Sequence, residues 1–162
     1  MLTEAQCDEV VKEYAPMLAR IASSYENDKH LQQDLLQEIS LAVWRACASF
    51  RGDASVKTFV AKVAHNRCVD YVIKASNQTD NVELSDGMLI SQNSDNQEKS
   101  RDLMSAINRL SLSLRQVITM QLEGFTYSEI ASVLGTSEAA VTKRAGRARA
   151  LLEQLLGSNN NG

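Results

Sequence analysis

The sequence "YSEIASVLGTSEAAVTKRAGRARALL", residues 127–152, predicts two helices joined by a tight turn. Thr126 and Glu129 form a capping-box pattern at the start of the first helix. Gly135 marks the end of that helix, because glycine adopts the left-handed conformation at little cost. Ser137 is the expected cap of the second helix. This arrangement is typical of a helix-turn-helix unit.

Small and apolar residues occupy the positions that such a unit has to bury. Ala131 is small where the two helices cross, and Val141 is an apolar residue on the second helix that faces the first. Ile130, Leu134 and Leu151 are expected to complete the core. An alanine, a glycine and a valine at this spacing, within a capped helix pair, are a fairly specific signal for the helix-turn-helix.

Four basic residues fall within seven positions of the second predicted helix: Lys143, Arg144, Arg147 and Arg149. They spread over a broad exposed arc, because residues three and four apart share a helix face. Such an arc fits the DNA major groove, where phosphates supply affinity and a few side chains read base edges. The alternative is that these residues only complement the helix dipole and keep the surface soluble. Within a helix-turn-helix frame we favour DNA binding.

The overall charge places a condition on this DNA binding. The chain has a net charge of −3, so a duplex is repelled by most of the molecule outside the basic cluster. Tight binding therefore needs a second partner that contacts DNA, or dimerisation. This need for help favours a protein that binds DNA as part of a larger assembly.

The composition favours helices. With 162 residues and a hydrophobic share of 44%, the chain can fold into one domain or two small ones. Seven glycines, one proline and an aromatic share of 5% favour helices over sheets. No apolar run is long enough for a membrane span, and the acidic N-terminus lacks a secretory pattern. We therefore expect a cytoplasmic protein.

Nothing in the sequence predicts an enzyme, a metal site or a cofactor. Cys7, Cys47 and Cys68 are far apart and are never spaced as C-x-x-C, so we expect reduced, partly buried thiols. His30 and His65 are the two histidines, which makes a zinc site improbable. There is no G-x-S-x-G and no glycine-rich phosphate loop.

Charge is distributed unevenly along three segments. Residues 1–74 hold ten acidic and nine basic residues, and residues 101–162 hold five acidic and seven basic residues. Residues 75–100 hold five acidic residues and one basic residue, with many Ser and Asn. This middle segment has no sustained period and predicts a flexible acidic linker. The sequence therefore predicts an all-α protein of two small helical domains joined by a flexible acidic linker.

The first segment predicts three amphipathic helices. Thr3 and Gln6 form a capping box at the start of the first helix, and Pro16 is expected to kink or split it. The second helix covers residues 31–49 and the third runs from about residue 56 to residue 74.

Between the second and third helices, Gly52 is the expected turn residue, and Asp53 or Ser55 is the expected cap. The last segment adds a short helix over residues 102–110 and a longer one over residues 113–123. Both precede the helix-turn-helix.

Three stretches resemble one known family in the same order. They are "DLLQEISLAVWR" (residues 34–45), "FRGDASVKTFVAKVAHNRCVDYVIK" (50–74) and "LSLSLRQVITMQLEGFTYSEIASVLGTSEAAVTKRAGRAR" (110–149). Together they look like an extracytoplasmic-function (ECF) sigma factor of the sigma-70 family, and the resemblance covers nearly the whole chain. It implies an alternative sigma factor that binds core RNA polymerase and directs promoter recognition, DNA melting and transcription initiation. The polymerase would carry out the chemistry.

The resemblance implies three sets of binding residues. Those matching the segment that grips the β′ clamp helices of the polymerase are Asp34, Leu36, Gln37, Glu38 and Trp44. Those matching the contacts to the melted −10 strand are Phe50, Arg51, Asp53, Ser55, Lys57, Lys62, His65, Asn66 and Arg67. Those matching the contacts to the −35 duplex, beside the β flap, are Arg115, Ser137, Thr142, Lys143, Arg144 and Arg147. Acids and amides suit a basic partner helix, and cations and an amide suit single-stranded DNA.

The resemblance also implies a division of labour along the chain. Residues 1–74 correspond to the domain for polymerase and the −10 element, and residues 101–157 to the domain for the −35 element. Residues 75–100 are the linker, expected to thread a basic channel of the polymerase, and residues 158–162 form a disordered tail. An anti-sigma factor is a common partner in this family.

Two other functions remain as alternatives. A stand-alone helix-turn-helix regulator would bind duplex DNA without polymerase and would not depend on Asp34 or Glu38. A helical adaptor would use the same faces for protein contacts and would keep its activity after Arg144→Glu. An enzyme is the weakest alternative, because no cluster of titratable residues converges.

Overall fold

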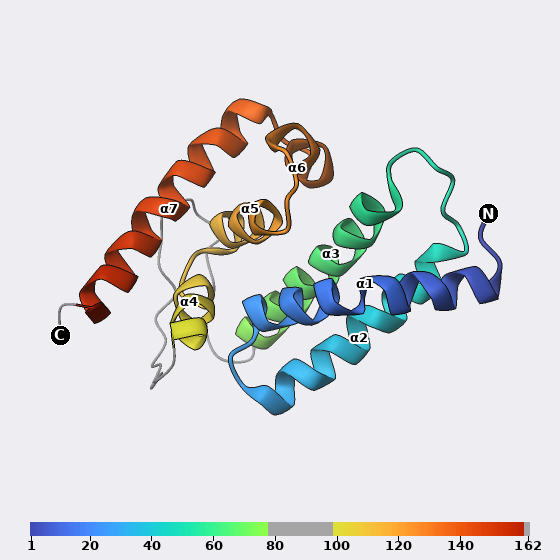
Figure 1. The fold of residues 1–162 in the computed structure, drawn as a ribbon, viewed down its shortest axis with the longest axis horizontal. Coiled ribbons are helices and arrows are strands. Elements are labelled where there is room, and N and C mark those ends of the chain that lie inside the picture. The colour runs from blue at the N-terminus through green and yellow to red at the C-terminus, as the bar shows by residue number, and fades with distance from the viewer. Residues whose placement is uncertain (78–98, 161–162) are drawn as a thin grey trace. The chain divides into compact units, whose positions relative to one another are not determined.

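The computed structural model describes residues 1–77 and 99–160, which form seven helices (Figure 1). The chain divides into unit 1, Met1–Asn81, and unit 2, Val82–Gly162. The predicted all-α fold with two helical domains is confirmed, and the described residues contain no strand. Most of the predicted linker, residues 78–98, lies outside the described residues, as do residues 161–162 of the predicted tail.

Unit 1 is a bundle of α1 (Glu4–Tyr25), α2 (Lys29–Cys47) and α3 (Val56–Asn77), in which each helix packs against the other two. Its core is apolar, and each helix contributes one face to it. The largest contributions come from Leu18, Ile21, Leu35, Ile39, Val43 and Val60.

Local side-chain chemistry sets the ends of these helices. Gln6 donates its N–H to the Thr3 hydroxyl at 3.2 Å and accepts the Thr3 N–H at 2.8 Å, which confirms the capping box. Pro16 lies inside α1 without splitting it. Asp28 caps α2 by accepting two backbone N–H groups, and the hydroxyl of Ser55 caps α3 by accepting the N–H of Thr58.

All three cysteines are buried in unit 1 and form no disulfide. Cys7 lies on α1, Cys47 ends α2, and Cys68 lies on α3. Burial raises the pKa of Cys47 to about 11, and the neighbouring thiol of Cys7 adds to this shift. At neutral pH Cys47 is therefore a protonated, apolar core residue.

Unit 2 consists of α4 (Lys99–Asn108), α5 (Leu112–Leu122), α6 (Tyr127–Leu134) and α7 (Glu138–Asn160). The long helix α7 packs against each of the other three (Figure 1). One buried cluster joins α4, α5 and α7, and it contains Ala106, Ile107, Leu110, Leu114, Ile118, Ala148 and Leu152.

Helices α6 and α7 form the helix-turn-helix with the predicted caps. Thr126 accepts the N–H of Glu129 at 3.1 Å, and Glu129 accepts the N–H of Thr126 at 2.8 Å. Gly135 has φ 68° and ψ 36°, the left-handed conformation expected at the end of α6. The hydroxyl of Ser137 accepts the N–H of Ala140 at 3.1 Å and caps α7.

The core of the helix-turn-helix is close to the one predicted. Ile130, Ala131 and Val141 are buried as expected. Leu134 and Leu151 are only partly buried. The small α7 residues Ala145 and Ala148 are fully buried as well. Their small side chains allow the neighbouring helices to approach closely.

Candidate functional site

The first candidate surface is the exposed face of α2. Asp34, Gln37 and Glu38 are all exposed there. Leu41 shares this face, because it lies seven, four and three residues after them, and 46% of it is exposed. Leu41 is not among the residues predicted from the resemblance, although its helical spacing relative to the acids is visible in the sequence.

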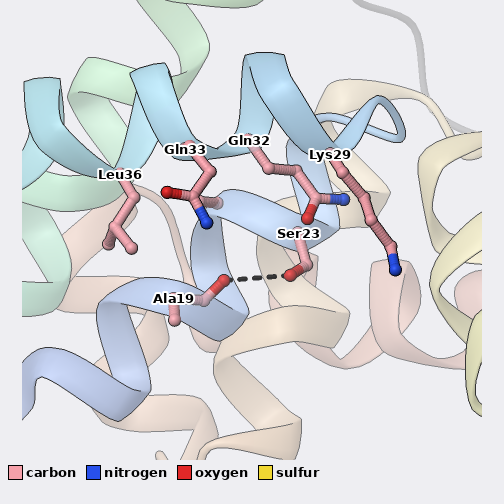
Figure 2. A pocket seen from close by; sticks show the side chains of 7 residues that line it. Ala19, Ser23, Lys29, Gln32, Gln33 and Leu36 are labelled. Atoms are coloured by element: carbon pink, nitrogen blue, oxygen red, sulfur yellow. Dashed lines mark hydrogen bonds between the residues drawn. The ribbon is translucent and has the colours of Figure 1, made fainter.

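The two apolar residues predicted for polymerase binding lie toward α1 instead. Trp44 donates its indole N–H to Oδ1 of Asp8 at 2.7 Å. Leu36 lines a hollow of about 190 Å³ between α1 and α2 (Figure 2). The remaining residues that line this hollow are Ala19, Ala22, Ser23, Lys29, Gln32 and Gln33. Trp44 therefore links α2 to α1, Leu36 borders the hollow between these helices, and Leu41 is an exposed apolar residue on the α2 face.

The second candidate surface begins at the loop before α3. The rings of Phe50 and Phe59 contact each other with centroids 5.1 Å apart, which fixes the start of the loop on α3. Gly52 has φ 83° and makes the turn, as predicted. Arg51 and Asp53 are exposed beyond it, so the loop presents charged side chains from an anchored base.

The same surface continues along α3. Lys62, Asn66 and Arg67 are exposed, and Lys57 is partly buried. Lys62 and Asn66 are one turn apart and share a helix face. A cation and an amide presented in this way can contact the backbone and base edges of a single strand.

His65 is a predicted strand-binding residue that the structure places in the core. Its side chain is fully buried against Tyr25, and its Nδ1 lies 2.8 Å from the Tyr25 hydroxyl. Burial lowers the pKa of His65 to about 4, so the ring is neutral at pH 7. A buried, neutral ring offers nothing to a phosphate, and we therefore leave His65 out of the candidate surface.

One ion pair joins the first two surfaces. Arg67 of α3 donates from Nη2 to Oε1 of Glu38 on α2 at 2.8 Å, and each side chain is 46% exposed. These two residues belong to different predicted binding sets. Their proximity has no sequence signal, because it depends on how α2 and α3 pack.

The third candidate surface is the outer side of α7. Lys143, Arg147 and Arg149 are exposed and Arg144 is partly buried. The hydroxyl of Thr142 donates to the carbonyl oxygen of Glu138 at 2.9 Å. The helix-turn-helix thus presents a row of cations along one helix, the arrangement that binds phosphates beside the major groove.

Arg115 is a second predicted DNA contact that the structure buries. Only 1% of it is exposed. Its Nη2 donates to the carbonyl oxygens of Asn108 at 2.7 Å and Leu110 at 2.9 Å. These carbonyls belong to the last residue of α4 and to the turn after it, so the guanidinium holds the corner between α4 and α5 together. We therefore leave Arg115 out of the duplex-binding surface.

Across residues 1–77 and 99–160, no three His, Cys, Asp or Glu side chains converge in a way that could hold a metal ion. Within the same ranges, no helix is long and apolar enough to cross a membrane.

Comparison with known proteins identifies the family. The model for sigma-70 region 2 matches residues 10–78, and the model for sigma-70 region 4 matches residues 100–152. The chain belongs to the sigma-70 family. This sigma factor carries both matched regions in the order that the sequence analysis expects.

Curated relatives place this sigma factor in the ECF group. It is 28% identical to the ECF RNA polymerase sigma factor SigM of Mycobacterium tuberculosis over 96% of this chain and 79% of the relative. It is 26% identical to the ECF sigma-E factor of Escherichia coli over 89% of this chain and 83% of the relative. ECF sigma factors are alternative initiation factors that bind core RNA polymerase and direct promoter recognition, and they are not enzymes. This sigma factor has that function.

Solved structures share the fold. The sigma factor RpoE of Bartonella quintana, in complex with the anti-sigma factor NepR, aligns over 93% of this chain and 96% of that chain, with TM-score 0.73 and 23% identity. CnrH, in complex with the cytosolic domain of CnrY, aligns over 96% of this chain and 90% of that chain, with TM-score 0.68 and 23% identity.

Proposed function

We propose that the two units of this sigma factor divide promoter recognition between them. Residues 1–74 bind core polymerase and the −10 element, and residues 101–157 bind the −35 element. The order of the two family matches along the chain supports this division. The observation that carries it is the row of exposed cations on α7 within a capped helix-turn-helix.

The polymerase contact is the exposed face of α2. Asp34 and Glu38 supply negative charge, and Gln37 supplies an amide. Leu41 is one of two exposed large apolar residues on this helix, together with Leu31. A basic partner helix with one apolar position matches this face, because the charges complement each other and Leu41 loses contact with water on binding.

The −10 contact combines the loop after Phe50 with α3. Arg51 and Lys62 attract the phosphates of a melted strand, and Asn66 offers donors and an acceptor to a base. Asp53 and Ser55 lie in the same loop, where the family captures a flipped base. The packing of Phe50 on Phe59 supports this proposal, because it gives the loop a fixed base.

The −35 contact is the outer side of α7. Lys143, Arg144 and Arg147 neutralise phosphates, while Ser137 and Thr142 lie near the start of the helix, where base edges are read. Arg149 is two residues after Arg147 and therefore lies on another side of the helix. Its Nη2 lies 3.4 Å from the Tyr127 hydroxyl of α6, which orients it beside the first helix of the motif.

We also infer the cellular setting from the family. A sigma factor that binds RNA polymerase works in the cytoplasm. An anti-sigma factor is a further proposed partner, supported by the two solved neighbours, whose structures are complexes with NepR and CnrY.

Reconstituted transcription tests the division between the units. The purified chain and core polymerase should initiate selectively on a subset of a promoter library. Asp34→Lys should abolish initiation by weakening core binding, and Arg144→Glu should abolish it by weakening duplex binding. Lys12→Glu and Glu153→Lys are matched controls, because both reverse an exposed charge outside the three surfaces.

The two variants should also fail at different steps. Core polymerase pulled down with tagged Arg144→Glu should match wild type, whereas Asp34→Lys should recover little polymerase. Normal initiation by Asp34→Lys would contradict polymerase binding through the α2 face of unit 1. Normal initiation by Arg144→Glu would contradict −35 binding by unit 2.

A further inference from the structure

The ion pair between Glu38 and Arg67 lies at the boundary of two proposed interfaces. Glu38 belongs to the α2 face for polymerase, where it lies one turn from Asp34. Arg67 follows Asn66 on α3, in the surface proposed for the −10 strand. Their side chains meet at 2.8 Å, and each is 46% exposed. Glu38 is therefore accessible to the polymerase and Arg67 to the DNA strand, although the two side chains are paired with each other.

The register of α2 and α3 explains this meeting. Arg67 and Tyr71 are one turn apart on α3, and both face α2. The Tyr71 hydroxyl donates to Oε1 of Glu26 at 2.6 Å. Burial, this bond and the charges of Glu26, Glu38 and Asp34 raise the pKa of Tyr71. The carboxylates of Glu26, Asp34 and Glu38 thus lie near Tyr71, and Arg67 pairs with that of Glu38.

We propose that the Glu38–Arg67 ion pair couples polymerase binding to −10 strand binding in this sigma factor. The inference rests on the proposed function of the two surfaces. Cations of the polymerase compete with Arg67 for the Glu38 carboxylate, and DNA phosphates compete with Glu38 for the Arg67 guanidinium. Whichever partner binds first breaks the pair and frees the other residue, so each partner strengthens the binding of the other.

The exposure of the pair sets the size of this coupling. Solvent-exposed ion pairs contribute little, so the coupling is about two- to fivefold in affinity. Screening by salt should reduce it further. A small, salt-dependent coupling is therefore the expected signature.

The first measurement is the affinity for core polymerase in the absence of DNA. Arg67→Ala should bind about two- to fivefold more tightly than wild type at low salt, because Glu38 is released. In a Glu38→Gln background, Arg67→Ala should have no such effect. Lys74→Ala is the matched control, because it removes an exposed cation from the same helix at a position outside the three surfaces.

The second measurement is the affinity of the free, full-length chain for a fluorescent single-stranded oligonucleotide. Glu38→Gln should bind more tightly than Asp34→Asn, although both remove one negative charge from α2. The difference should be about two- to fivefold at low salt. It should disappear when Arg67 is replaced by alanine. Thermal unfolding of each variant checks that all of them are folded.

The outcomes separate this proposal from the proposed function. If Glu38→Gln weakens polymerase binding while Arg67→Ala leaves it unchanged, the α2 face is retained and the coupling is overturned. Weaker polymerase binding by Arg67→Ala would also overturn the coupling, because Arg67 would then belong to the polymerase interface itself. If Glu38→Gln binds polymerase normally, the assignment of Glu38 to the polymerase face fails, and the coupling fails with it.

Discussion

Tyr25 and His65 form a polar contact inside the core of unit 1. Their rings meet edge to face with centroids 5.6 Å apart, and the tyrosine hydroxyl lies 2.8 Å from Nδ1. Nε2 of His65 is buried and has no hydrogen-bond partner among the described residues. A second proton on this ring would therefore be poorly accommodated, because a buried charge without a partner is costly.

The stability of unit 1 should fall in mild acid for this reason. In the unfolded chain His65 takes up a proton near pH 6.5, whereas in the folded chain its pKa is about 4. The unfolded state binds more protons between these values, so stability is lost as the pH falls through this window. The loss attributable to His65 is roughly 3 kcal/mol by pH 4.

Urea unfolding followed by Trp44 fluorescence measures this effect in unit 1, because Trp44 is the only tryptophan. Wild type should lose roughly 3 kcal/mol more than His65→Gln between pH 7 and pH 4. Parallel pH profiles for the two proteins would contradict the prediction.

Leu41 and Trp44 should respond in opposite ways to substitution. Leu41→Ser should weaken binding to core polymerase about tenfold, as expected for an apolar residue at the centre of an interface, and should leave the melting temperature unchanged. Trp44→Phe should cost about 1 kcal/mol of stability through loss of the hydrogen bond to Asp8, with little change in polymerase affinity. If the two variants weakened polymerase binding equally, Leu41 would not be the main apolar contact on the α2 face.

At the scale of elements, two glycines of the helix-turn-helix have different functions. Gly135 ends α6 with φ 68°, whereas Gly146 lies within α7. An added Cβ at either position would meet no heavy atom within 4 Å. Steric clash is therefore absent at both, and backbone conformation alone decides the effect of adding a methyl group.

The two alanine substitutions should consequently change stability in opposite directions. Gly135→Ala should destabilise unit 2 by about 1–2 kcal/mol, because an L-residue resists the left-handed conformation. Gly146→Ala should stabilise α7 by about 1 kcal/mol through helix propensity. Unfolding followed by circular dichroism compares them directly, and a shift in the same direction for both would refute the argument.

The helices could be predicted from the sequence because their signals are local. Both capping boxes and the turn at Gly135 involve residues at most five positions apart. Helix α6 begins and ends where its caps indicate. The ends of α3 and α7 lie three residues beyond the predicted ones, at Asn77 and Asn160.

The positions of several site residues could not be predicted, because they depend on packing. Arg115 and His65 carry polar groups and were expected at a surface. The structure buries both. The Tyr25 hydroxyl lies beside Nδ1 of His65, and the carbonyl oxygen at the end of α4 accepts a hydrogen bond from Arg115. The pairing of Glu38 with Arg67, 29 residues away, has the same origin.

At the scale of the whole molecule, the distribution of charge limits what the free chain can do. Residues 1–74 carry a net −1, residues 75–100 a net −4 and residues 101–162 a net +2, which gives −3 in total. Within the described ranges, the densest run of cations lies on α7, where four basic residues fall within seven positions. The binding energy for a promoter must therefore be shared with the polymerase.

The free chain should bind a promoter duplex weakly. At about 0.15 M salt we expect a Kd no tighter than about 1 μM, the range of non-specific binding. The complex with core polymerase should bind the same duplex at least about a hundredfold more tightly. Fluorescence anisotropy with a labelled promoter measures both, and nanomolar binding by the free chain would favour a stand-alone regulator.

The burial of all three thiols in unit 1 provides a natural chemical probe. Unit 2 contains no cysteine, so an alkylating reagent can modify only the first half of the chain. Because each sulfur is shielded, modification requires that unit 1 open transiently, and its rate reports the population of open molecules. Peptide mass spectrometry of the alkylated sites can therefore follow the opening of one half of this sigma factor inside a complete initiation complex.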